Sequence, residues 1–163
     1  MSNLELSQQA ELSFANLKNI FHRSKFIDGD LELQLECEHI VIGIQQVERY
    51  ETDVSFYIGL REEKISFTFR DMAYALVDDP SLAIPKNLEE MPVRNRNNIE
   101  VEKFIQFCIT YKDKLQEWPP TWFSKASNHS IKELSMHFEG IAETTRLEHQ
   151  EIMQKWVTGK KGV

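Results

Sequence analysis

Between residues 31 and 69 apolar side chains recur at every second position, and this spacing constrains the fold more than any other feature of the chain. Leu31, Leu33, Leu35 and Cys37 alternate with Glu32, Gln34, Glu36 and Glu38. A period of two places these sets on opposite faces of a strand. The alternation returns at 54–60 and, after four polar residues, at 65–69, which predicts a hairpin. Residues 39–47 predict another strand, although their apolar positions also fit a helical stripe.

Helical spacing flanks this strand-rich stretch on both sides. Apolar stripes predict helices over residues 5–23, 70–77 and 99–117, and the proline-containing segment 78–98 predicts a long connection. Ser130 and Glu133 have the spacing of a capping box that would begin a last helix. That helix would bury Leu134, Phe138, Ile141, Thr145, Ile152 and Trp156. Gathered strands indicate an α+β fold with an N-terminal helix, an antiparallel sheet of three or four strands and a helical C-terminal half packed on one face.

Length and composition are those of a single globular α+β domain over residues 1–163, with 158–163 as a frayed tail. A chain of 163 residues that is 41% apolar buries enough surface to fold without a metal or disulfide. Cys37 and Cys108 lie on apolar stripes and are expected to be reduced core thiols. The sequence shows no secretory leader and no long uncharged apolar run, so we expect a cytoplasmic protein without membrane contact.

Negative charge is concentrated in one part of the chain. The formal net charge is −7, and residues 28–53 alone contain eight acids and one base, so they account for all of it. The acids are Asp28, Asp30, Glu32, Glu36, Glu38, Glu48, Glu51 and Asp53. Such a balance argues against general nucleic-acid binding and favours a basic protein partner, because complementary charge speeds association and suppresses wrong partners.

Residues suited to catalysis or metal binding occur, but in weak patterns. His129, Glu133 and His137 have one-turn spacing that could hold a metal, yet no HExxH pattern accompanies them. The chain has no phosphate-binding glycine loop and no nucleophile elbow, and Arg94 with Arg96 is more typical of a solvated polar loop. We therefore expect no metal, no cofactor and no catalytic residue.

A second candidate surface is the aromatic corner at Trp118 and Trp122. Exposed tryptophans often dominate partner contacts, whereas buried ones would cap the core at this helix break. With the acidic window, these residues predict a non-catalytic protein-binding module, for example an immunity protein that inhibits a nuclease toxin. The alternatives are a small enzyme or ligand-binding domain with an unrecognised site, or a phage or host-defence accessory protein.

Overall fold

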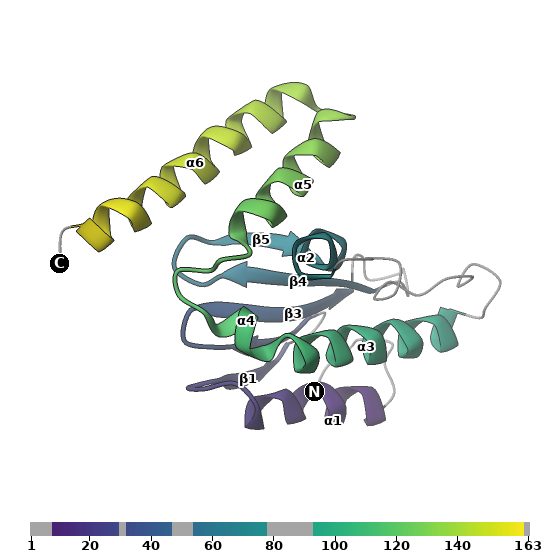
Figure 1. Ribbon diagram of the computed structural model, residues 1–163. Coiled ribbons are helices and arrows are strands. Elements are labelled where there is room, and N and C mark those ends of the chain that lie inside the picture. The colour runs from purple at the N-terminus through teal and green to yellow at the C-terminus, as the bar shows by residue number, and fades with distance from the viewer. Residues whose placement is uncertain (1–7, 30–31, 47–53, 78–92, 162–163) are drawn as a thin grey trace.

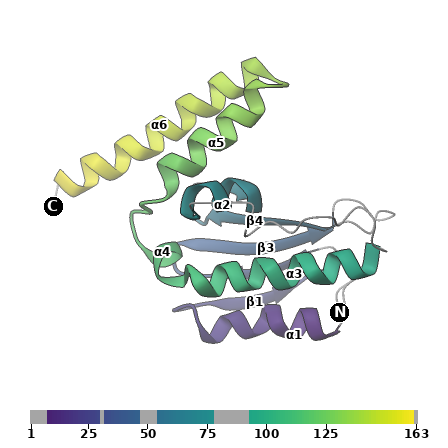
Figure 2. The ribbon, with the colours of Figure 1, turned by 45° about the vertical axis from the view of Figure 1, so that its right-hand side comes forward.

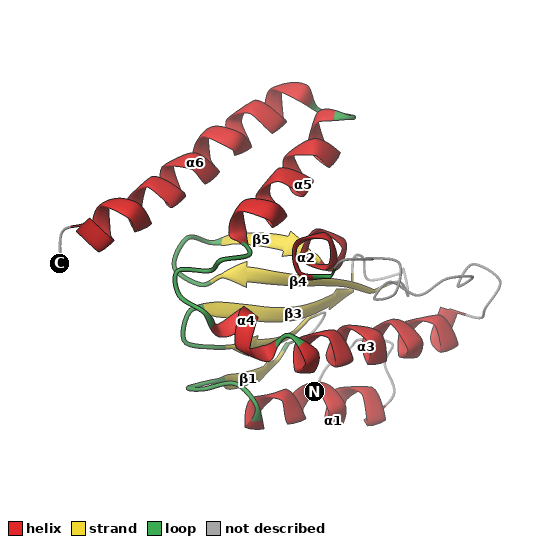
Figure 3. Ribbon diagram, in the orientation of Figure 1, coloured by secondary structure: helices red, strands yellow, loops and turns green. Residues whose placement is uncertain are grey.

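The structure, a computed structural model, describes residues 8–29, 32–46, 54–77 and 93–161, and within them the side chains of 12–29, 32–46, 54–77 and 98–158. Five antiparallel strands form one sheet in the order β1-β2-β3-β4-β5 (Figures 1 and 3). The strands are β1 Lys25–Asp28, β2 Glu32–Glu36, β3 Ile40–Gln46, β4 Val54–Leu60 and β5 Ile65–Thr68. The α+β class and the antiparallel sheet are therefore confirmed, with one or two more strands than predicted.

Strand register divides the sheet into a buried face and an open one. Leu33 pairs with Ile44, and Leu35 with Ile42, and all four are fully buried. The intervening residues pair across the opposite face, which we call the open sheet face. It comprises Lys25, Ile27, Glu32, Gln34, Glu36, Val41, Gly43, Gln45, Ser55, Tyr57, Gly59, Ser66 and Thr68. The segment from Ile40 to Gln46 is a strand, so the helical alternative for it is wrong.

The helices that the structure describes cover the buried face only. The helices are α1 Gln8–Asn16, the 3-10 helix Leu17–Asn19, α2 Phe69–Leu76, α3 Val93–Thr110, α4 Lys112–Gln116, α5 Phe123–Ser135 and α6 Glu139–Lys161. In Figures 1 and 2, α1 and α3 lie side by side against the same face of the sheet. Phe104 of α3 contacts the ring of Phe56 on β4 at 4.8 Å, which locks the central helix onto the core.

The C-terminal helices depart from the prediction. Ser130 lies within α5, so it caps nothing, and the chain turns at 136–138 before α6 begins. The expected single stripe therefore mixes two helices, and Phe138 and Ile141 are exposed by 58% and 55%. The hairpin of α5 and α6 extends beyond β5 and does not lie flat on the sheet (Figure 1). Among the described residues, no helix combines the length and apolar composition needed to cross a membrane.

Two helix boundaries also differ from the prediction. The helix α3 begins at Val93, so Arg94 and Arg96 lie in its first turns and not in a loop, and Tyr111 separates it from α4. The first helix ends at Asn16 and continues as one 3-10 turn. Apolar periodicity identified both helices, but their ends depend on local backbone contacts that periodicity does not encode.

Both cysteines are buried and unbridged, as predicted. Burial raises the pKa of Cys37 to about 12, against the opposing charge of Arg61, and burial also raises the pKa of Cys108. At pH 8 we expect both thiols of the folded protein to react with a maleimide at least about a hundredfold more slowly than in the urea-unfolded chain, because the thiolate is the reactive form. Rapid modification of either thiol in the folded protein would contradict this.

Phe67 joins the sheet to the helical hairpin. Its ring lies 5.9 Å from Trp122, 5.4 Å from Phe123 and 5.6 Å from His149. Phe67→Ala is expected to lower the free energy of unfolding by about 3–5 kcal/mol, since it leaves a cavity among large rings. The control Ser66→Ala changes the exposed neighbour and should cost less than about 0.5 kcal/mol. Urea unfolding of both variants measures the difference, and equal midpoints would place Phe67 outside the core.

Candidate functional site

The open sheet face carries a fixed arrangement of polar side chains across its three central strands. The Tyr57 hydroxyl donates to Oε1 of Glu32, and Nε2 of Gln34 donates to the same oxygen at 2.9 Å. Nε2 of Gln34 also lies 2.7 Å from the Tyr57 oxygen. Burial and the bond to Glu32 raise the pKa of Tyr57, so its hydroxyl stays protonated and keeps donating.

Gly43 is what allows this arrangement. A Cβ at position 43 would overlap the ring of Tyr57, so that ring lies directly on the backbone of β3. With no side chain beneath it, the ring can cross from β4 to β2 and reach Glu32. Sequence reasoning recognised Glu32 as outward facing but missed Tyr57, because only the register of β2, β3 and β4 brings these residues together.

The predicted acidic patch is smaller in the structure than in the sequence. Glu36 lies 3.8 Å from Arg61, and Glu38 lies 3.2 Å from Arg23. Both arginines come from outside the window 28–53, so the count of charges along the chain overstated the local excess. Asp28 is exposed at the end of β1. The remaining predicted acids, Asp30, Glu48, Glu51 and Asp53, lie outside the described residues.

The two tryptophans of the aromatic corner have different surroundings. Trp122 is 2% exposed and packs on Phe67, which removes it from the accessible surface and matches the core-capping alternative. Trp118 is 37% exposed and stacks on His39 at 4.4 Å, with Trp156 edge-on at 5.5 Å. A groove of about 270 Å³ runs beside it, lined by Pro119, Pro120, Thr121, Phe123, Ser124, Met153, Trp156 and Val157.

His129 belongs to a different set of residues from the one its spacing suggests. Its Nδ1 lies 2.6 Å from Oδ1 of Asp71, which comes from α2, and its Nε2 lies 3.5 Å from Oε1 of Glu133. Across the described residues, no three His, Cys, Asp or Glu side chains form a group that could hold a metal ion.

A second histidine lies inside the helical hairpin. Ser127 Oγ and His149 Nδ1 are 2.6 Å apart, and both residues are almost completely buried. This contact resembles that of a catalytic serine, but a substrate cannot reach it. Burial lowers the pKa of His149 despite the opposing charges of Glu148 and Asp71, which keeps the imidazole neutral and the hairpin interior uncharged.

Comparisons of the chain with protein-family models, curated proteins and solved structures gave no match. Its function therefore has to be inferred from these sites alone.

The buried His149 predicts loss of stability in acid. Because its folded pKa lies below the unfolded value of about 6.5, the unfolded chain binds a proton that the folded protein does not. The free energy of unfolding should fall as the pH drops below about 6.5, with a slope of up to about 1.4 kcal/mol per pH unit from this residue. His149→Phe keeps a ring beside Phe67 and should flatten that slope between pH 7.5 and 5.5 in urea titrations. Identical slopes in the two proteins would assign the acid sensitivity to other groups.

Proposed function

We propose that this chain is a non-catalytic protein-binding module that docks on a basic protein, such as a nuclease toxin, through its open sheet face. The preorganised carboxylate of Glu32 is the observation that carries the proposal. Its Oε1 accepts from both Tyr57 and Gln34, while its Oε2 accepts from no described residue. One oxygen is therefore held in place, and the other can accept from a partner's lysine or arginine at little entropic cost.

The rest of the open sheet face supports the same role. No described helix lies over it (Figures 1 and 2), and most of its other residues are small or polar, such as Gly59, Ser55 and Ser66, with Ile27 and Val41 as its aliphatic members. A flat rigid sheet presents such groups without rearrangement on binding. Glu36, the last residue of β2, and Glu38, in the turn after it, add negative charge to this surface. Their ion pairs with Arg61 and Arg23 partly neutralise that charge. Trp118 is the one candidate aromatic contact that remains exposed.

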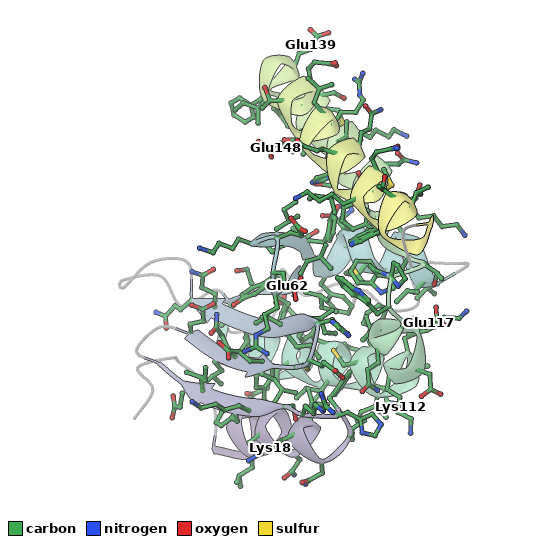
Figure 4. All side chains as sticks on the ribbon, turned by 90° about the vertical axis from the view of Figure 1, so that its left-hand side faces the viewer. Lys18, Glu62, Lys112, Glu117, Glu139 and Glu148 are labelled. Carbon is green, nitrogen blue, oxygen red and sulfur yellow. The ribbon has the colours of Figure 1, made fainter. Side chains whose placement is uncertain are left out.

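The experiment compares charge reversal on two surfaces. Glu32→Lys with Glu36→Lys changes the open sheet face, and Glu143→Lys with Glu151→Lys makes the same charge change on α6. The two double variants are matched in the ion pairs that they lose. Glu36→Lys removes the exposed pair with Arg61, and Glu143→Lys removes the exposed pair with Arg146. Figure 4 shows that α6 rises away from the strands toward its N-terminal end, which is labelled at Glu139.

A basic partner captured from native lysate should bind the α6 variant normally and the sheet variant poorly. For the sheet variant we expect association about tenfold slower at 0.1 M salt, with a smaller difference at 1 M salt, where screening shortens the Debye length to about 3 Å. Tyr57→Phe changes no charge but releases Glu32, so it should accelerate dissociation several-fold. Equal binding of the wild type and the folded sheet variant at low salt would refute the proposal.

A further inference from the structure

A pocket of about 460 Å³ lies where α2 begins, against the C-terminal half of α5 and the turn that follows it. Its lining comprises Thr68, Arg70, Asp71, His129, Ser130, Glu133, Leu134, His137 and Phe138. A volume of this size lies within the range of small-molecule sites. The pocket shares Thr68 with the open sheet face, and its lining includes His129, Glu133 and His137, the set whose one-turn spacing the sequence had shown.

One end of the pocket is polar and rigid. Asp71 Oδ2 accepts from the Thr68 amide at 3.0 Å, while Thr68 Oγ1 accepts from the Asp71 amide at 3.1 Å, so the capping box of α2 holds the Asp71 side chain. The other oxygen of Asp71 holds His129. The ring of Tyr74 stacks on His129 at 4.1 Å and restrains it from the side.

The hydrogen bond to Asp71 determines what His129 offers to a ligand. A carboxylate can only accept, so Nδ1 of His129 carries a proton and Nε2 is the ring nitrogen left on the Glu133 side. The 3.5 Å between Nε2 and Glu133 exceeds a normal hydrogen bond. Nε2 of His129 and the Glu133 carboxylate therefore lie next to each other at this end of the pocket without a normal hydrogen bond between them.

The other end of the pocket is apolar. Leu134 and Phe138 line it, and Phe138 is exposed by 58%. Met136 and Ile141 beside the turn are exposed by 66% and 55%, although both are large apolar side chains. A ligand body placed here would remove Phe138 from water, which is favourable in proportion to the apolar area covered.

We infer that this pocket binds a small amine, a ligand with an apolar body and a protonated amino group. The amino group would donate to the Glu133 carboxylate beside His129, and the body would lie on Leu134 and Phe138. Asp71 and Glu133 make the polar end unfavourable for a carboxylate or phosphate. Arg70 is the cation among the lining residues, and it lies 3.9 Å from Glu133 and is itself largely exposed, so it offsets this charge only in part.

The test uses three molecules with one body, hexylamine, hexanol and hexanoate, titrated into the folded full-length protein. Binding is followed by calorimetry and by the NMR signals of the His129 ring. We expect saturable one-to-one binding of hexylamine, with hexanol about fivefold weaker or more, because it lacks the charge. Hexanoate should not bind. Equal affinity for hexanol, a preference for hexanoate, or no saturable binding of hexylamine would each overturn the inference.

Variants assign the binding to the two ends of the pocket. Glu133→Gln should abolish the preference for hexylamine over hexanol, whereas the control Glu151→Gln on exposed α6 should retain it. Phe138→Ala should weaken both ligands about equally, since it shortens the apolar end. Glu133 and Phe138 are both exposed enough for these variants to remain folded, which an unchanged unfolding midpoint would verify. Unchanged hexylamine affinity in Glu133→Gln would also overturn the assignment.

Discussion

Because side chains alternate across a strand, burying Leu33, Ile42 and Ile58 against the helices forces every intervening residue to the opposite face. A shift of one residue in β2 or β4 would bring Glu32 or Tyr57 into the core and leave a leucine or an isoleucine in water. The covering helices therefore gather on one side, and the other side keeps a polar surface. The position of Glu32 thus follows from the burial of its neighbours.

The same one-sided packing determines where the pocket forms. The last strand ends at Thr68, and the capping box begins α2 immediately, so Asp71 lies at the edge of the sheet where α5 passes. One oxygen of the Asp71 carboxylate accepts from the Thr68 amide at the start of α2. The other oxygen is free to accept from Nδ1 of His129. A local rule for starting a helix thereby fixes a histidine 58 residues further along the chain.

The sequence predicted β2 to β5, their outward and inward faces and the burial of Cys37, because these depend on the alternation of apolar residues. The burial of Cys108 followed from the helical spacing of apolar residues over 99–117. The sequence missed β1, since four residues from Lys25 to Asp28 are too few to show a period. It also merged α5 and α6, because apolar spacing continued by chance through the turn at 136–138. The Asp71 and His129 contact and the Tyr57 network were out of reach, since each joins residues from separate elements.

The ring of Tyr57 lying on Gly43 also has a consequence for how this chain can evolve. A larger residue at position 43 is compatible with the fold only if the side chain at position 57 does not cross β3, and a ring that does cross there demands glycine at 43. The two positions should therefore change together among descendants of a common ancestor. Lineages that lose the tyrosine should be free to vary the glycine, and in them the carboxylate at position 32 would no longer be under the same selection.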